Sequence, residues 1–290
     1  MVTVFTPTYN RVHLLDRLYH SLTKQSCMDF EWLVIDDGST DGTQHYIENI
    51  QSENKIKIRY QRQENSGKHV AHNTAVFLAE GEWFYCVDSD DWLTENSISE
   101  ISAALKNTCA SDCALIGYKM LADGSMLCKP FTHQMSHKGF YDMVQMGAGG
   151  EYSIVLKTEL LREHLFPVVP GEKFSTEAIL YDKLELNGYT MYPVPFVLTI
   201  CEYQADGLTS QIYQSLLNNP TAYQLFHMQR IDLVKTWKER ICHAIQYQAF
   251  RSMSHKQKFV YSGAYKWMVD LFYIPGILGA KYYKTRRRSR

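Results

Sequence analysis

The stretch that most constrains this chain is an apolar run that ends directly in carboxylic acids. Residues 83–87 read Trp-Phe-Tyr-Cys-Val, and residues 88–91 read Asp-Ser-Asp-Asp. Such an unbroken apolar run predicts a short strand that is covered on both faces. Three carboxylates at its end would repel one another and would be costly to desolvate. A divalent cation with oxygen ligands would offset that cost, so the sequence predicts a metal site where the strand ends.

A plainer interpretation of the same acids is a helix cap. Asp90 or Asp91 could accept the first backbone N–H groups of a helix predicted over residues 94–106. A cap needs only one acid, however, and it explains neither Asp88 nor its position.

Composition narrows the class of protein. The chain has 290 residues, 45% of them apolar, and a net charge of −1, so nothing draws it as a whole to nucleic acid. Seven cysteines without a C-x-x-C pair favour a reducing cytoplasm. We expect no signal peptide, because a strand is predicted from Val2 onward. We also predict no membrane span, because the sequence contains no run of about 18 apolar residues.

The first third of the chain alternates predicted strands and helices, with strands at Val2–Phe5, Trp32–Ile35 and Ile56–Tyr60 before the acidic one. Short connections between them indicate a parallel sheet with helices on both faces. Polar loops at Thr6–Asn10, Asp36–Gly42 and Asp88–Asp91 follow strands, so neighbouring strands would gather them at one crevice. Asn10 is expected to cap the next helix.

After residue 107 the pattern is less regular. A strand is predicted at Cys113–Tyr118, a loop over residues 129–150, and a helix at Phe174–Leu184 opened by Ser175 or Thr176. His133 and His137 lie four residues apart in the loop, but a zinc site would need a third ligand. From residue 211 onward the pattern is helical, interrupted by Pro275-Gly276.

The C-terminal end combines aromatic and basic residues. Six Lys and Arg residues lie within positions 281–290, with no acid among them. Two interpretations stay open: peripheral contact with an anionic membrane, or a packing helix followed by a basic tail. Nucleic-acid binding by this tail is disfavoured.

Five motifs in register resemble the inverting family 2 glycosyltransferases with the GT-A fold, of the bacterial capsule and exopolysaccharide type. The motifs are Thr6–Arg11, Val34–Asp41, Asn65–Gly67, Ala71–Asn73 and Val87–Asp91. The resemblance implies an α/β fold: a Rossmann-like, mostly parallel sheet flanked by helices, with a C-terminal helical extension. It also implies a nucleotide-sugar-binding half at 1–107, an acceptor-binding half at 108–209 and a helical region with a basic tail at 210–290. Glu202–Thr209 resembles an acceptor-side motif of these enzymes.

The same resemblance implies roles on the donor side. Thr8 and Tyr9 would border the uracil of a UDP-sugar, and Asp37 would accept its ring N–H. Asp37 could instead make an Asx-turn before Gly38, and Lys68, expected at a phosphate or the donor sugar, could be a solvated first-turn residue.

Residues 88–90 match the family's D-x-D motif. Asp88 is expected near the ribose or a metal-bound water, with Ser89 beside it, and Asp90 would coordinate Mn²⁺ or Mg²⁺ that bridges the two phosphates. The metal would stabilise the charge that develops on the leaving nucleoside diphosphate.

Inversion also requires a base that deprotonates the acceptor hydroxyl. The resemblance places it at Glu177, with Asp182 as the second candidate, whereas a first-turn capping acid is the structural alternative for Glu177. Relatives often have Glu-Asp here, but this chain has Glu177-Ala178, which leaves the register without a second acid.

The predicted function is the transfer of one sugar from a nucleotide-diphosphate donor to a glycan or polyprenyl-diphosphate-linked acceptor, at the inner face of the cell membrane. Two other classes stay open: a non-catalytic nucleotide-sugar-binding or assembly subunit, and a sugar nucleotidyltransferase. The latter would need a Gly-rich, Arg-containing loop after the first strand, where this chain has Thr6–Asn10.

Overall fold

The computed structural model describes residues 1–202, 204, 212–254 and 257–286. The chain divides into two compact units: unit 1 comprises residues 1–165 and 188–204, and unit 2 comprises residues 166–187 and 205–290. The predicted functional halves at 1–107 and 108–209 remain predictions. Of the predicted acceptor motif at 202–209, only Glu202 and Gln204 lie within the described residues.

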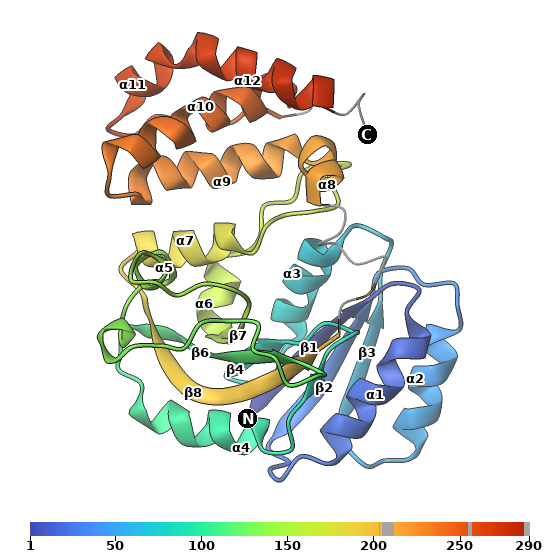
Figure 1. Cartoon of the computed structure of the whole chain (residues 1–290). Helices are drawn as coiled ribbons and strands as arrows, with labels where there is room; N and C mark the ends of the chain where they lie inside the picture. The colour runs from blue at the N-terminus through green and yellow to red at the C-terminus, as the bar shows by residue number, and fades with distance from the viewer. Residues whose placement is uncertain (203, 205–211, 255–256, 287–290) are drawn as a thin grey trace. The chain divides into compact units, whose positions relative to one another are not determined.

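Unit 1 is built on a mixed sheet whose described strands run in the order β3-β2-β1-β4-β7-β6-β8-β5 (Figure 1). The strands are β1 Val2–Thr8, β2 Phe30–Asp36, β3 Ile58–Arg62, β4 Trp83–Cys86, β5 Trp92–Leu93, β6 Asp112–Leu121, β7 Tyr152–Lys157 and β8 Thr190–Cys201. The four strands β3, β2, β1 and β4 are parallel, as the strand–helix alternation predicts. Beyond β4 the pairings of β7 with β4 and β6 are antiparallel, β6 and β8 are parallel, and β5 is antiparallel to β8.

Helices cover both faces of this sheet. They are α1 Val12–Thr23, α2 Thr43–Ser52, α3 Lys68–Leu78, α4 Ser97–Ala104, α5 Phe140–Gln145 and α6 Thr158–Glu163, with short 3₁₀ turns at Leu105–Asn107 and His133–Met135. Apolar residues of α1, α2 and α4 form one buried cluster with sheet residues such as Trp32 and Tyr85. On the other face, His72 of α3 contacts the rings of Phe5 and Phe84. The predicted α/β fold class is therefore confirmed.

β1 extends three residues further than predicted. Thr6–Thr8 pair with β2, although Pro7 lies among them and lacks a backbone N–H. Val87 N–H donates to the Phe5 carbonyl, so Phe5 faces β4, and Pro7, two residues on, faces the same side. The pairing of β4 with β1 ends at Cys86. The N–H that Pro7 lacks is therefore not needed for a hydrogen bond to β4.

The predicted cap of α1 is wrong. Asn10 has a left-handed backbone (φ 52°), and its side-chain oxygen accepts from Thr40 N–H instead. The first turn of α1 is capped across the chain by Asp41, which accepts from Val12 N–H at 2.9 Å. The two loops that follow β1 and β2 are thereby bonded to each other.

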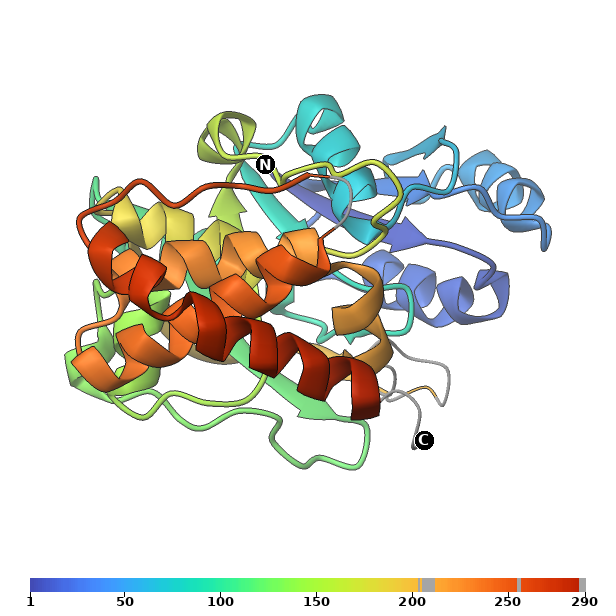
Figure 2. The same cartoon turned by 90° about the horizontal axis from the view of Figure 1, so that it is seen from above.

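Unit 2 is helical: α7 Ala178–Leu186, α8 Ile212–Asn218, α9 Pro220–Leu233, α10 Trp237–Met253, α11 Lys266–Leu271 and α12 Tyr273–Arg286. Within it, α10 packs against both α9 and α12 (Figures 1 and 2). Pro275 and Gly276 do not interrupt the helix as predicted, because Pro275 lies in the first turn of α12, where no N–H is needed. A Cβ on Gly276 would lie 2.3 Å from Gln248 Cβ, so glycine allows the close approach of α12 to α10.

Candidate donor and metal site

The carboxyl ends of three neighbouring parallel strands bring the polar loops together. β1 lies between β2 and β4, with Thr8 opposite Asp36 and Phe5 opposite Cys86. The loops that contain Thr8, Asp37 and Asp88 therefore follow adjacent strands at the same edge of the sheet, where open α/β sheets bind ligands.

Asp37 is buried and fixes the loop that leads into α3. Its Oδ1 accepts from Ser66 N–H at 2.9 Å, and its Oδ2 accepts from Gly67 N–H at 2.7 Å. Gly67 has φ 98°, a conformation that favours glycine, and it directly precedes Lys68 at the start of α3. The loop before α2 is held by the neighbouring Asp36, whose Oδ1 accepts from Ser39 N–H three residues on. Asp37 thus holds the loop that positions Lys68 at the start of α3.

Thr8 and Tyr9 differ in exposure at the end of β1. Thr8 is 3% exposed, and its buried hydroxyl has no hydrogen-bond partner among the described residues. Tyr9 is 48% exposed. An unsatisfied buried hydroxyl beside an exposed aromatic ring suits a ligand that is both polar and planar.

Lys68 and Asp88 form an ion pair across this edge. Lys68 Nζ lies 2.7 Å from Asp88 Oδ1 and 2.9 Å from Oδ2. Burial alone would raise the pKa of Asp88, but the charges of Lys68 and Lys119 lower it below its usual value. Lys68 is therefore not a merely solvated first-turn residue.

The ionised form of Asp90 is less well stabilised than that of Asp88. Burial and the negative charge of Asp88 raise its pKa, and the Arg11 guanidinium, 3.0 Å away, offsets this only in part. Burial also raises the pKa of Asp91. The Asp91 carboxylate forms an ion pair with Lys119, whose side chain is mostly buried, at 3.1 Å. Ser89, between the acids, is buried.

The helix-cap interpretation of these acids is wrong. β5 separates Asp91 from α4, which begins only at Ser97. Asp91 N–H donates to the Asp88 carbonyl at 3.0 Å, so the three acids lie on a tight turn between β4 and β5. The turn directs separate carboxylates toward Lys68, Arg11 and Lys119.

The acids fit a cation that a phosphate ligand would help to hold. Asp88, Asp90 and Asp91 do not form a set of ligand atoms close enough to enclose an ion by themselves; in the described part of the chain only Cys109, Asp112 and His137 do. Mg²⁺ is usually held by one or two carboxylates together with phosphate oxygens. Burial and the charge of Asp88 raise the pKa of Asp90, so a bound cation would favour the ionised form of Asp90.

Three basic residues at the turn were not predicted as site residues. Arg11 contacts Asp90, Lys119 contacts Asp91, and Arg17 donates to the Asp90 backbone carbonyl at 3.0 Å. Arg11 belongs to the first motif and could have been singled out. Lys119 lies on β6, 28 residues away, and no local pattern marks it.

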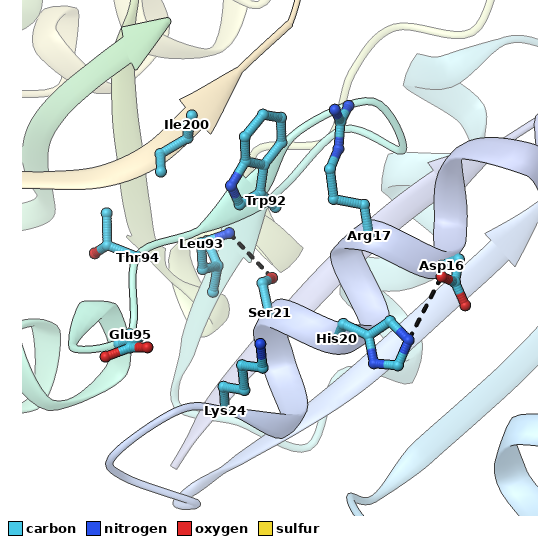
Figure 3. A pocket seen from close by; sticks show the side chains of 10 residues that line it. All are labelled: Asp16, Arg17, His20, Ser21, Lys24, Trp92, Leu93, Thr94, Glu95 and Ile200. Carbon is cyan, nitrogen blue, oxygen red and sulfur yellow. Dashed lines mark hydrogen bonds and ion pairs between the residues drawn. The ribbon is translucent and has the colours of Figure 1, made fainter. Parts of the chain in front are cut away.

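Arg17 also joins the turn to a neighbouring pocket of about 620 Å³ (Figure 3). Its guanidinium lies 3.9 Å from the Trp92 ring centre, and it pairs with Glu202 at 2.7 Å. The lining comes from α1, from Trp92–Glu95 and from Ile200. None of the predicted site residues lines this pocket, although Trp92 follows the acidic turn directly.

The two candidate bases lie in unit 2 and differ sharply. Glu177 is exposed at the start of α7, and its side chain makes no capping hydrogen bond to the helix backbone. Asp182 is completely buried and accepts a hydrogen bond from Arg230 Nε. Burial raises the pKa of Asp182 to about 6, against the lowering effect of Arg230.

Comparison with known proteins identifies the family of this chain. The model of the family described as glycosyl transferase family 2 matches residues 3–142. TuaG of Bacillus subtilis, a glycosyltransferase assigned to teichuronic acid biosynthesis, is 30% identical over 241 residues, which cover 82% of this chain and 92% of TuaG. The chain therefore belongs to glycosyltransferase family 2.

Two further proteins are similar to this chain. The Escherichia coli UDP-Glc:alpha-D-GlcNAc-diphosphoundecaprenol beta-1,3-glucosyltransferase WfgD is 30% identical over 177 residues, covering 60% of this chain and 67% of WfgD. The crystal structure of S. aureus TarS 1–349 in complex with UDP-GlcNAc superposes with a TM-score of 0.62 at 16% identity, covering 99% of this chain and 91% of that one. The TarS structure shows a shared fold.

Proposed function

We propose that this glycosyltransferase is an inverting, metal-dependent enzyme that uses a UDP-sugar donor. The observation that carries the proposal is the gathering of Thr8, Asp37, Lys68, Asp88 and Asp90 at one edge of the parallel sheet. The names of WfgD and the TarS complex, which include UDP-Glc and UDP-GlcNAc, support a uridine nucleotide and a hexose or N-acetylhexosamine.

On the donor side, Tyr9 and Thr8 would border the uracil, and Asp37 would accept its ring N–H. The orphaned Thr8 hydroxyl supplies a polar group that needs a partner, and Tyr9 supplies an exposed ring. Because two loop N–H groups already hold the Asp37 carboxylate, it would be preorganised when the nucleotide arrives.

Asp90 and Asp88 would hold Mn²⁺ or Mg²⁺ together with the diphosphate of the donor. The cation would supply electrostatic stabilisation of the leaving UDP. Lys68 would move from the Asp88 carboxylate toward a phosphate or the donor sugar, since its long side chain allows both contacts. Arg11 would keep Asp90 oriented through their 3.0 Å contact.

For the base we favour Glu177 over Asp182. A general base must reach the acceptor hydroxyl, and Glu177 is exposed whereas Asp182 is buried against Arg230. Asp182 would instead hold α7 to α9 within unit 2 through this ion pair.

The acceptor would be a glycan or a lipid-linked glycan of a bacterial surface polysaccharide. The names of TuaG and WfgD support this class, since one refers to teichuronic acid and the other to a diphosphoundecaprenol-linked sugar. In the described part of the chain no helix has both the length and the apolar character needed to cross a membrane. We propose that this chain reaches a lipid-linked acceptor through a surface contact.

Helices α11 and α12 present such a surface. Five exposed apolar side chains recur at intervals of three or four residues along these two helices, and we call them the apolar stripe: Trp267, Leu271, Ile274, Leu278 and Tyr282. The opposite side, which includes Met268 and Ala280, packs into unit 2. Lys281 and Lys284 are exposed nearby, so we propose that this stripe rests on an anionic membrane. Of the basic tail, residues 287–290 lie outside the described residues.

Donor hydrolysis tests the proposed reaction. The purified protein would be incubated with UDP-, GDP- and dTDP-sugars in the presence of Mn²⁺, Mg²⁺ or EDTA, and the released nucleotide measured. We expect slow release from one UDP-sugar that EDTA stops. Release that EDTA does not affect would remove the metal from the proposal. Absence of both release and nucleotide binding would instead favour an assembly subunit.

A further inference from the structure

A second group of ligating side chains lies on unit 1, apart from the acidic turn. Cys109 precedes β6, Asp112 is the first residue of β6, and His137 lies in the loop after the 3₁₀ turn at 133–135. We propose that these three residues bind a zinc ion, which fastens the 129–139 loop to the start of β6. Neither the family resemblance nor the proposed transfer reaction requires this site.

The three ligand atoms already converge. His137 Nδ1 lies 3.4 Å from Cys109 Sγ and 2.8 Å from Asp112 Oδ2, and one ligand atom from each residue lies within 4.8 Å of the others. Zinc–ligand bonds of about 2.0–2.3 Å in a tetrahedron separate ligand atoms by about 3.3–3.6 Å. An ion would fit between these atoms if the His137–Asp112 contact opened by a few tenths of an ångström.

The donor set selects the metal and argues against a catalytic triad. Sulfur, imidazole nitrogen and carboxylate oxygen favour Zn²⁺ over Mg²⁺ or Mn²⁺, which prefer oxygen. In a nucleophilic triad the acid and the thiol would contact different ring nitrogens, whereas here both contact Nδ1. A fourth position is left for water, as the ring and the thiol are exposed.

The surroundings hold the ligands in place. Asp112 is completely buried, and its carboxylate accepts from Cys109 N–H at 2.8 Å and from the Thr190 hydroxyl at 2.7 Å. Such bonds to a ligand's remaining lone pairs typify metal sites.

The backbone of His137 is also unusual. Its φ of 56° lies in the left-handed region, which residues other than glycine seldom adopt. His137 N–H donates to the Met191 carbonyl of β8, and this bond holds the loop where the ring meets Asp112. Strained backbone of this kind is concentrated at functional sites.

The chain supplies matched controls for a zinc titration. Metal-stripped protein would be titrated with Zn²⁺, and with Co²⁺ to detect thiolate coordination by absorption. Asparagine tolerates a positive φ, so His137→Asn removes the ligand without disturbing the loop, and His133→Asn alters an exposed histidine of the same loop. We expect one zinc per chain, an affinity at least about tenfold lower in His137→Asn and Cys109→Ser, and no change in His133→Asn.

Thiol protection provides an independent readout. Cys109 and Cys242 are both exposed, so alkylation rates of the two can be compared by peptide mass spectrometry with and without zinc, in a background of excess Mg²⁺. Zinc should slow alkylation of Cys109 alone, and His137→Asn should abolish the protection. Equal protection of Cys242, or equal loss of zinc in His133→Asn and His137→Asn, would reveal an adventitious surface ion only and overturn the proposal.

Discussion

At the scale of single residues, the ionised form of Asp90 is unfavourable for the stability of the acidic turn. Burial and the charge of Asp88 raise the pKa of Asp90, so the folded protein holds this proton more tightly than the unfolded chain. The resulting contribution to stability is present below the unfolded pKa of about 3.9 and is lost as the pH rises through the raised value. At neutral pH the ionised Asp90 therefore opposes folding unless a cation is bound.

Substitution of Asp90 by asparagine should separate its effect on stability from its proposed role as a metal ligand. Without metal at pH 7 we expect Asp90→Asn to raise Tm by about 1–3 °C, and this gain should vanish toward pH 3. Donor turnover should fall at least about 100-fold, because the metal loses a ligand. Thermal melts and nucleotide release measure the two effects. Asp123→Asn, at an exposed turn where hydrogen bonds lower the pKa, is the control and should not raise Tm.

The pKa of Asp88 is shifted in the opposite direction from that of Asp90, because Asp88 pairs with Lys68. Lys68 lowers the pKa of Asp88, so Lys68→Met should let Asp88 take up a proton at higher pH. The acid limb of the kcat/KM profile should then move upward, and kcat/KM at pH 7 should fall about 10–100-fold. Lys68→Arg should restore the position of the acid limb. A profile that keeps its shape in Lys68→Met would contradict the assigned pairing.

At the scale of elements, α7 carries a buried charge that makes unit 2 sensitive to pH. The pKa of Asp182 is raised to about 6, so its contribution to stability is present below about 4 and lost as the pH rises through 6. A shift of this size corresponds to roughly 3 kcal/mol. In Asp182→Asn, the fall in stability between pH 4.5 and 7 should be correspondingly smaller, as measured by denaturant unfolding. An unchanged pH dependence would show that Asp182 is ionised throughout.

The apolar stripe of α11 and α12 predicts a lipid contact that can be removed by two substitutions. Leu271→Gln with Ile274→Gln should weaken sedimentation with phosphatidylglycerol vesicles at least about tenfold, because each apolar side chain contributes about 1.5–3 kcal/mol when buried. Met28→Gln changes an exposed apolar residue of unit 1 and should have no effect. Equal binding of wild type and the double variant would contradict the proposal.

The elements themselves were largely predictable, and their ends were not. Uninterrupted apolar runs and helical spacing located β1, β2, β4 and the helices between them, because these signals are local. The extension of β1 through Pro7 depended on where β4 stops pairing. The cap of α1 depended on Asp41, which is 29 residues away from Val12. Both are tertiary effects that override local preference.

At the scale of the whole molecule, the sequence located the acids but not their partners. Order and spacing of the motifs predicted that the loops after β1, β2 and β4 would share one edge, and the strand order agrees. Lys119 contacts Asp91, which is 28 residues away, and His137 contacts Asp112, which is 25 residues away, so no local pattern marks either pair. The assignments of Asp37, Asp90 and Glu177 to donor, metal and base remain predictions.

Calorimetric titration with UDP tests the central claim, a metal-dependent nucleotide site at the acidic turn, most directly. We predict that UDP binds wild-type protein at least about tenfold more tightly with Mn²⁺ than with EDTA, a difference of about 1.4 kcal/mol. In Asp90→Asn this difference should disappear, while the weak metal-free binding persists. Equal affinity for UDP with and without Mn²⁺ in the wild type would contradict the account.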